Sequence, residues 1–499
     1  MSLIGVDVGL SGCRVLAISH DGLPLAQARQ TYAPERNSDG DLSLDLSALW
    51  EAVQAAVAEA AQRTRSDRPQ AICITSSSLA LVPLAAEGGA LAPPVLSAAS
   101  LPAEEPRGGF GGLSLDQVVH TLGDRPPSIS ALRALCDWRH EQPQLYAHTW
   151  RAVPLATLVA FRLGGACLVD ASMAAAMHML DVATGAWSSQ ALRAAGLGDV
   201  KLPEIAPAAT LLGTVARPAA ERLGLGRELR IVLGGADYAC AALGVGALQT
   251  GQGLLSLDRV VSILAAYEAL PLVGLLYSHG LNTVLHVAPE RWLSQVLTSS
   301  GGNVLHWLRD AWLMHEAREA AARGHDFYRR LMDEMPAEPT SLVAIPPPDE
   351  ALLGGAGAPA TAGVWGISGR TTRGEVVKAF LEGVMLACMP GLDALRAAGI
   401  MLETLRATGP GARSEPWLQL AADVLGIEVV ETGVLYPAPL GAAMLAGVGV
   451  GAYSSLREAI DIVVRPQRRY EPRAKHTEAY AALRERYRAI ADGLSHADG

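Results

Sequence analysis

Two aspartates in apolar surroundings are the residues of this 499-residue chain best suited to chemistry. Asp237 follows the apolar residues 231–233 and two glycines, and it precedes a segment rich in Ala and Gly. This order predicts a strand, a tight turn and a helix start with an acid at the turn. Such an aspartate either caps the helix by accepting backbone N–H groups or faces a cleft as a general base. The residues alone favour the cap, because Asp is a preferred cap residue.

Asp7 is the second such acid, since it stands within the apolar run IGVDVGL near the N-terminus. Burying a carboxylate without a partner is costly, so we expect Asp7 to face a polar or metal-lined cleft. Gly9, Ser11 and Gly12 follow at the tip of a predicted hairpin. Glycines at a tip let backbone N–H groups approach phosphate oxygens, although for this tip in isolation we prefer an ordinary surface hairpin.

The elements that carry these acids are predicted to form a mixed α/β layer. Residues 3–33 read as three short strands, 45–65 as a helix and 70–75 as a buried strand, an order unlike a dinucleotide-binding unit. The Gly/Pro-rich stretch 97–127 is expected to run over the surface. Further helices are predicted over residues 130–141, 153–163, 186–196, 301–316, 317–336 and 372–398.

A second hairpin pattern covers residues 252–268, with Asp258 and Arg259 at its tip. The chain therefore restarts near residue 250, and residues 273–278 predict another strand. Two halves that each open with a hairpin and end in helices indicate an internal duplication around a central cleft.

Composition narrows the class of partner. The length predicts two to four domains, and with half of the residues hydrophobic and 18% charged the chain is expected to be compact. A formal net charge of -10 provides no basic field for nucleic acid or an anionic membrane, so a small molecule is the favoured partner. No apolar stretch of spanning length is found, so no membrane partner is expected.

The compartment is predicted from the N-terminus and the cysteines. The first residues lack the basic region and cleavage site of a signal peptide. The cysteines are scattered, without the close pairs of a zinc site or a disulfide framework: Cys13, Cys73, Cys136, Cys167, Cys240 and Cys388. Both observations favour a reducing, cytoplasmic location.

Several motifs now in hand resemble the FGGY family of carbohydrate kinases, in its xylulokinase-like branch and within the actin-like ATPase superfamily. The segment GGADYACAALGVG is similar to the family's catalytic-base motif, and ATGPGARSEPWLQLAADVLGIEVV (407–430) resembles its adenosine motif. PLGAAMLAGVGVGAYSSLREA (439–459) is similar to the segment that follows. The resemblance implies two ribonuclease H-like α/β domains with a central cleft: residues 1–246 on the sugar side and 247–499 on the nucleotide side.

The resemblance also implies roles for single residues. Asp237 would be the base of an ATP-dependent phosphorylation of a sugar, ketose or polyol hydroxyl, and Asp7 would lie near Mg²⁺, through water. The residues implied at the nucleotide and its phosphates are Gly9, Ser11, Arg14, Gly409, Gly411, Ala412 and Ser414. Ser77, Ser78 and Asp237 would face the sugar. A homodimer is compatible with this family.

Departures from the family pattern leave two hypotheses open. Leu10 replaces a Thr, Arg14 a Lys, and Pro410 stands within the nucleotide turn. The family's Gly-Thr-Ser-Gly tip and three polar sugar-side loops are replaced at residues 258–261, 76–80, 97–101 and 348–352. A substrate other than xylulose is therefore expected. The chain is either an active kinase or a non-catalytic relative that binds nucleotide or sugar; an oxidoreductase is disfavoured, because no Gly-x-Gly-x-x-Gly follows a strand.

Overall fold

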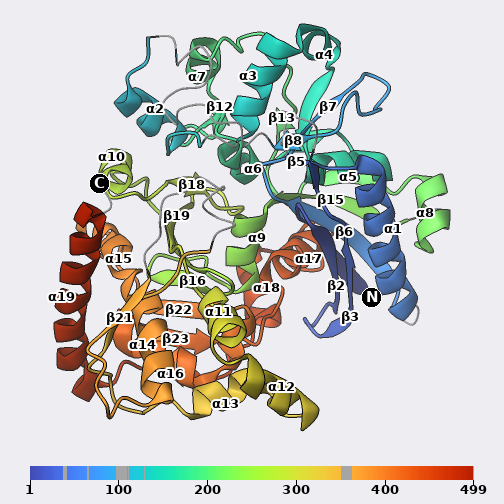
Figure 1. Cartoon of the computed structure of the whole chain (residues 1–499). Helices are drawn as coiled ribbons and strands as arrows, with labels where there is room; N and C mark the ends of the chain where they lie inside the picture. The colour runs from blue at the N-terminus through green and yellow to red at the C-terminus, as the bar shows by residue number, and fades with distance from the viewer. Residues whose placement is uncertain are drawn as a thin grey trace. The chain divides into compact units, whose positions relative to one another are not determined.

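A computed structural model of the chain describes residues 1–36, 42–64, 67–96, 110, 112–127, 130–226, 228–349 and 362–497. The departures expected at residues 97–101 and 350–352 lie outside these ranges. The chain forms two compact units (Figure 1). The first comprises Met1–Gln249, Ala266–Ser294 and Tyr436–Val464; the second comprises Thr250–Ala265, Gln295–Leu435 and Arg465–Gly499.

These units alternate along the chain, whereas the sequence suggested one division between residues 246 and 247. Two later segments, 266–294 and 436–464, complete the first unit. The division at 246/247 stays a prediction about the order of the family domains. It does not describe which residues share a core, because the second segment packs against strands from the start of the chain.

The first unit is built on a six-stranded sheet with the order β14-β15-β6-β1-β2-β3. Its strands are β1 (Ser2–Val8), β2 (Gly12–Ser19), β3 (Pro24–Thr31), β6 (Pro69–Ser76), β14 (Leu211–Thr214) and β15 (Arg230–Ala236). The first three strands pair antiparallel as predicted, and β6 runs parallel to both β1 and β15. Every residue of β1 is buried, which explains its nearly continuous apolar run.

Helices cover this sheet on both sides (Figure 1). The main ones are α1 (Leu46–Arg63), α5 (Leu155–Leu163), α9 (Asp237–Gly244), α17 (Pro437–Gly449) and α18 (Leu456–Val463). Helix α1 packs on β2 and β3, and it begins where the Asp45 carboxylate accepts the Ser47 N–H at 2.7 Å. Helix α17 packs on β1, β6 and α9.

Shorter elements complete the first unit. Its strands are β4 (Glu35–Arg36), β5 (Leu42–Ser43), β7 (Leu81–Leu84), β8 (Val95–Leu96), β9 (Arg151–Pro154), β10 (Leu168–Val169), β11 (Leu180–Asp181), β12 (Ala186–Trp187), β13 (Glu204–Ile205) and β18 (Val284–Leu285). Its helices are α2 (Leu115–Leu122), α3 (Ala131–Glu141), α4 (Pro143–His148), α6 (Ala171–Ala176), α7 (Ser189–Ala194), α8 (Arg217–Leu223) and α10 (Val273–Ser278). Strand β19 (Trp292–Leu297) runs across the boundary at Ser294.

The second unit contains a sheet in which β17, β16, β22, β23 and β24 are successive neighbours, although the last two residues of β17 belong to the first unit. Their bounds are β16 (Gln252–Leu257), β17 (Val261–Tyr267), β22 (Thr404–Thr408), β23 (Glu428–Glu431) and β24 (Arg469–Tyr470). Strand β16 is antiparallel to β17 and parallel to β22, β23 is parallel to β22, and β24 is antiparallel to β23. The run β2-β1-β6-β15-β14 has the same directions, as expected for an internal duplication.

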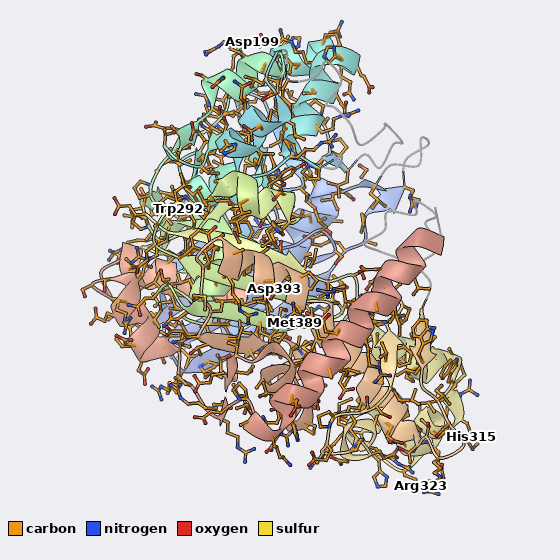
Figure 2. All side chains as sticks on the ribbon, turned by 90° about the vertical axis from the view of Figure 1, so that its left-hand side faces the viewer. Asp199, Trp292, His315, Arg323, Met389 and Asp393 are labelled. Carbon is orange, nitrogen blue, oxygen red and sulfur yellow. The ribbon has the colours of Figure 1, made fainter. Side chains whose placement is uncertain are left out.

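The remaining elements of the second unit are mostly helical. They are α11 (Asn303–Ala311), α12 (Met314–Ala322), α13 (Phe327–Asp333), α14 (Arg373–Leu386), α15 (Met389–Ala397), η1 (Pro410–Arg413), α16 (Glu415–Leu425), α19 (Ala474–Ala497), β20 (Val343–Ile345) and β21 (Gly363–Trp365). The terminal helix α19 lies beside α15 (Figure 2), where Arg484 pairs with Asp393. In the part of the chain that the structure describes, no helix is long and apolar enough to cross a membrane.

Two expectations about local structure were wrong. Residues 273–278 form helix α10 and not a strand, since a short apolar run suits either element. In the described part of the stretch expected to run over the surface, residues 115–122 form α2, whose start is fixed by a capping box between Ser114 and Gln117. The helices predicted over 301–336 and 372–398 are broken into α11 to α13 and into α14 and α15, with Pro390 in the first turn of α15.

Glycines bring α17, α9 and β1 into closer contact than side chains would allow. A Cβ at Gly441 of α17 would overlap the Cys240 carbonyl oxygen of α9. A Cβ at Gly244 would overlap the Pro437 carbonyl, and one at Gly5 the Pro439 carbonyl. Because the overlapping atoms belong to backbone, no rotamer change can relieve them.

The substitution Gly441→Ala tests this packing. We expect it to destabilise the protein by about 2 kcal/mol or more, since overpacking a well-packed core costs about 1–3 kcal/mol and here the obstacle is backbone. Thermal unfolding measures the change. Gly493→Ala is the control, because Gly493 is also helical but has nothing within 4 Å of its Cβ position. Equal melting temperatures for Gly441→Ala and the parent would contradict the close contact.

Candidate active site

The carboxyl ends of three parallel strands meet at one edge of the first sheet. Strands β1 and β15 both run parallel to β6, so Asp7, Ser76 and Asp237 stand at or just beyond neighbouring strand ends. The Thr75 hydroxyl donates to the Gly235 carbonyl at 2.7 Å and ties β6 to β15. The topology thus brings together two acids that are far apart in the sequence.

Asp237 is the first residue of α9 and does not cap it. The capping position belongs to Ala236, and α9 has no side-chain cap hydrogen bond. The Asp237 carboxylate accepts the N–H of the next residue, Tyr238, at 2.7 Å. Asp237 is therefore not the N-cap residue, although it satisfies one N–H of the first turn, and the carboxylate retains acceptor capacity for another group.

Burial and like charge make Asp237 titrate near neutral pH. Burial raises its pKa to about 7, and the neighbouring charge of Asp7 acts in the same direction. Burial also raises the pKa of Asp7 to about 6, while the positive charge of Arg14 opposes that rise. A carboxylate whose pKa lies near the working pH is suited to accept a proton and release it again.

Asp170 and Ser172, to which the sequence reasoning gave no role, hold the turn before Asp237. The Asp170 carboxylate is 2% exposed and accepts the Ser172 hydroxyl at 2.7 Å. The Ser172 hydroxyl oxygen accepts the Ala236 N–H at 3.0 Å, and the Ser172 carbonyl accepts the Tyr238 hydroxyl at 3.1 Å. The pattern Asp-x-Ser at the start of α6 could have revealed this capping pair.

The two serines expected at the substrate follow β6 at the same edge. The Ser78 hydroxyl donates to the Ala176 carbonyl at 2.9 Å, so its proton is already committed. The Ser77 hydroxyl oxygen accepts the Leu79 N–H at 3.4 Å, which leaves its own proton for another acceptor. Of these two residues, Ser77 has the greater capacity to bind a substrate.

The first predicted phosphate turn is a true hairpin tip. Asp7 and Arg14 are opposite each other in the β1–β2 register, and Gly9, Ser11 and Leu10 form the turn. The Gly9 N–H donates to the Gly12 carbonyl at 2.9 Å. This bond occupies one of the N–H groups expected to reach a phosphate, whereas the Ser11 side chain is exposed.

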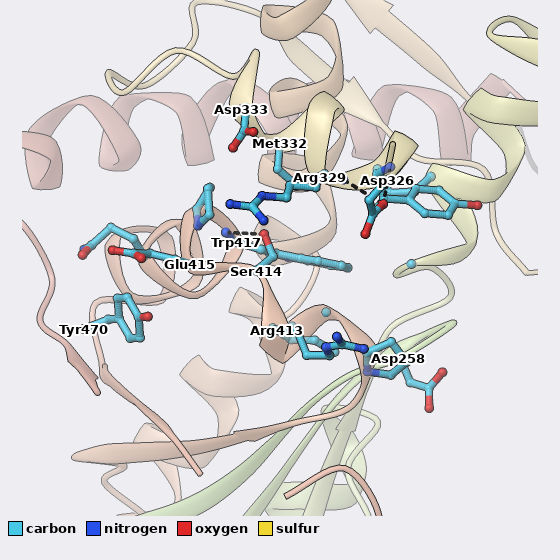
Figure 3. A pocket seen from close by; sticks show the side chains of 18 of the residues that line it. Asp258, Asp326, Arg329, Met332, Asp333, Arg413, Ser414, Glu415, Trp417 and Tyr470 are labelled. Atoms are coloured by element: carbon cyan, nitrogen blue, oxygen red, sulfur yellow. Dashed lines mark hydrogen bonds between the residues drawn. The ribbon is translucent and has the colours of Figure 1, made fainter. Parts of the chain in front are cut away.

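The nucleotide turn lies at a pocket of about 1050 Å³ that belongs entirely to the second unit (Figure 3). The tip of the β16–β17 hairpin, η1 and the starts of α11, α13 and α16 contribute its walls. Gly411 and Ser414, both predicted from sequence, line this pocket. Gly409 and Ala412 do not belong to its lining, and Ala412 is buried.

The glycines of this turn serve packing. Gly409 has a φ of 88° and its Cβ would lie 2.9 Å from the Leu257 carbonyl oxygen. A Cβ at Gly411 would lie 2.6 Å from the Trp417 ring, which is itself only 2% exposed. Pro410 starts η1, where a missing N–H leaves no helical bond unmade.

Two cations in the pocket have no acidic partner in the described part of the chain. Arg259 donates from two nitrogens to Asp349, each at 2.9 Å, and Arg473 pairs with Asp423. Arg329 and Arg413, by contrast, form no ion pair with the described residues, and Figure 3 shows both among the pocket side chains. These unpaired guanidinium groups give the pocket the capacity to bind an anion.

The hairpin tip Asp258–Arg259 forms another part of this wall. The Asp258 carbonyl accepts the Gly302 N–H at 2.7 Å, and its carboxylate accepts the Arg259 N–H at 2.7 Å. The predicted second hairpin is thus confirmed, with an acid at a pocket that also offers unpaired cations.

Magnesium would find a partial ligand set at the first sheet edge. No group of three or more His, Cys, Asp or Glu side chains able to hold a metal occurs among the described residues. Mg²⁺, however, commonly uses only one or two carboxylates and keeps several waters. Asp7, 8% exposed and facing the like charge of Asp237, fits that mode, because a cation there would offset their repulsion.

Comparison with known proteins now decides the family. The sequence model described as the N-terminal domain of the FGGY family of carbohydrate kinases matches residues 2–244, and that of the C-terminal domain matches residues 266–450. This chain belongs to the FGGY family of carbohydrate kinases. It is accordingly a carbohydrate kinase by family, a phosphotransferase with an alcohol group as acceptor.

Individual relatives are distant but span the chain. An autoinducer-2 kinase of Yersinia enterocolitica is 25% identical over 508 aligned positions, which cover 98% of this chain and 94% of that protein. The crystal structure of xylulose kinase from Rhodospirillum rubrum superposes on this chain with a TM-score of 0.84 at 24% identity. The alignment covers 100% of each chain. Glycerol kinase of Plasmodium falciparum with ADP has a TM-score of 0.82 at 16% identity and covers 98% of each. The predicted two-domain fold is confirmed.

Asp237→Asn tests the electrostatics of the sheet edge without any substrate. A folded-state pKa of about 7, raised from 3.8, means that ionising Asp237 costs stability increasingly as pH rises from 3.8 to 7. Removing the charge should therefore raise the melting temperature more at pH 8 than at pH 5. An equal or smaller gain at pH 8 would mean that the carboxylate is well solvated. In an Asp7→Asn background, the rise in melting temperature that Asp237→Asn causes at pH 8 should be smaller, because the like charge of Asp7 is gone.

Proposed function

We propose that the protein transfers the γ-phosphoryl group of ATP to a hydroxyl group of a small sugar, ketose or polyol. The observation that carries this proposal is Asp237, a carboxylate that is not the N-cap residue of α9 and has a pKa of about 7 at an edge shared with Asp7. Membership of a kinase family whose members use ATP supports it. Cytoplasmic location, and the absence of nucleic-acid and membrane partners, stay predictions from the sequence.

In this proposal Asp237 takes the proton of the attacking hydroxyl group as its oxygen bonds to the γ-phosphorus, while the bond to the ADP oxygen breaks. The turn held by Asp170 and Ser172 fixes the carboxylate that receives this proton. Asp7 would hold Mg²⁺, which supplies charge neutralisation at the phosphates when bound. Arg14, opposite Asp7, is placed to offset developing negative charge.

The nucleotide is assigned to the pocket of the second unit. Arg329 and Arg413 provide unpaired positive charge there, and Ser414 and Gly411 lie in the wall. The volume of about 1050 Å³ is at the upper end of what small-molecule sites offer, so an ATP-sized ligand fits. The predicted roles of Gly9 and Ser11 at the phosphates belong to this proposal as well.

The substrate is expected to have fewer hydroxyl groups near the Ser77–Ser78 turn than a pentulose. The Ser76 hydroxyl donates to the Ser77 carbonyl, and the Ser78 hydroxyl donates to the Ala176 carbonyl. Of these three serines, Ser77 is therefore the one whose hydroxyl proton is available to a substrate. The relatives named autoinducer-2 kinase make autoinducer-2 a candidate to test beside ketoses and polyols.

A non-catalytic nucleotide- or sugar-binding relative is the second candidate. It is favoured by the hairpin tips, where Leu10 supplies no hydroxyl group and Asp258 places a carboxylate in the pocket wall. The retained Asp237 favours the kinase.

Asp237→Asn should abolish turnover while leaving the fold and MgATP affinity nearly unchanged. The parent protein is first assayed with MgATP against a panel of sugars, polyols and autoinducer-2. We expect the variant to lose at least about 10²-fold in kcat, the range attributed to a general base, with calorimetric MgATP binding as the control. A variant with the parent's rate would remove Asp237 from the mechanism. A parent without turnover but with MgATP binding would favour the second candidate.

Arg413→Met and Arg329→Met should each weaken MgATP binding about tenfold, because a charge-assisted hydrogen bond contributes about 1.5–3 kcal/mol. Calorimetric titration measures this, and binding to the parent should weaken with added salt more than binding to the variants. Arg318→Met is the matched control, since Arg318 is exposed in the same unit and outside the pocket. Equal losses in all three variants would show a general charge effect instead of contacts in the pocket.

A further inference from the structure

The ring of Tyr436 lies against the guanidinium group of Arg14. The Arg14 guanidinium carbon is 5.8 Å from the Tyr436 ring centroid, within the range of a cation–π interaction. Both residues belong to the first unit, although they come from opposite ends of the chain. No motif in the sequence indicated that Tyr436 is near the predicted phosphate hairpin.

The backbone of Tyr436 is held in place. It occupies the capping position of α17, and Pro437 after it restricts its backbone, which has φ -123° and ψ 79°. Its carbonyl accepts the Leu440 N–H at 3.2 Å. Because the first turn of α17 packs against Gly5 of β1 without room for a Cβ, the position of Tyr436 relative to β1 is fixed.

The Arg14 guanidinium group is only partly engaged by Asp7, its second neighbour. Its Nη1 is 3.5 Å from the Asp7 carboxylate, longer than a good hydrogen bond, and the side chain is 46% exposed. A tyrosine ring attracts the face of a guanidinium group and occupies none of its N–H donors. The ring and the carboxylate together orient the group while leaving N–H groups for another acceptor.

We propose that Tyr436 is a positioning residue, whose ring holds the Arg14 guanidinium group beside Asp7 with N–H groups free to donate to the phosphoryl group in transfer. This inference rests on the proposed function for its kinetic part. A flat guanidinium group can stack on the ring and donate from its edge simultaneously, which a lysine ammonium cannot do in the same geometry. The contact thus accounts for an arginine at this position.

The kinetic test compares Tyr436→Leu with Tyr436→Phe. Leucine removes the ring and should lower kcat by about 2- to 30-fold with little change in the KM for the sugar, whereas phenylalanine keeps the ring and should restore the rate to within about twofold. In an Arg14→Ala background the leucine substitution should cause no further loss. Full additivity of the two losses, or equal losses for leucine and phenylalanine, would overturn the proposal.

A spectroscopic arm does not depend on kinase activity. In ¹⁵N-arginine-labelled protein the Arg14 Nε–Hε resonance is assigned by its disappearance in Arg14→Lys. An upfield ring-current shift is expected in the parent and in Tyr436→Phe, and it should be lost in Tyr436→Leu. If no sugar is phosphorylated, the proposed function fails while this shift still supports the placement of Arg14. An Arg14 resonance unchanged by the leucine substitution would overturn the placement.

Tyr146→Leu is the matched control for both arms. Tyr146 forms a similar ring contact, with the Arg139 guanidinium carbon 5.2 Å from its ring centroid, and its hydroxyl also accepts a hydrogen bond from Arg139 at 3.2 Å. It should shift the Arg139 resonance and leave kcat unchanged. A fall in kcat equal to that of Tyr436→Leu would show that loss of any such ring impairs the enzyme through general stability, and would overturn the positioning role.

Discussion

Helix α17 is packed against β1 and α9 without space for a single methyl group at Gly5, Gly244 or Gly441. This contact positions three functional residues. Strand β1 carries Asp7, α9 begins with Asp237, and Tyr436 immediately precedes α17. Their spacing cannot drift independently, since each is set by backbone touching backbone. The acids can remain close in spite of their repulsion because the packing around them leaves no room to separate.

Much of the fold could be predicted because local patterns carried it. The strands of the first hairpin, the second hairpin and the strand-turn-helix at Asp237 were expected from alternation, apolar runs and glycines at turns. Helix α10 was missed, since six apolar residues suit a strand as well as a helix, and α2 was missed although Ser114 and Gln117 mark its start. Gly324 and Pro390 are residues at which a helix break is expected, but the predicted helices ran through both of them.

The candidate site was only partly predictable, and the reason is distance along the chain. Asp237 and Asp7 could be chosen one by one, but their proximity depends on two parallel pairings with β6. The glycines at Gly409 and Gly411 were expected to admit a nucleotide, whereas the structure shows them meeting Leu257 and Trp417. The unpaired state of Arg329 and Arg413 is a property of tertiary structure, and no local pattern reveals it.

The interleaving of the two units has a consequence for biosynthesis. Residues 436–464 complete the first core, yet the ribosome releases them long after residue 249. At about 5–20 residues per second, the face of α9 that α17 covers stays uncovered for roughly 10 to 40 seconds, and that of β1 for about twice as long. The N-terminal half cannot finish folding on its own as a vectorially made domain. Both units therefore mature late and nearly together, and the nascent chain exposes apolar surface until then.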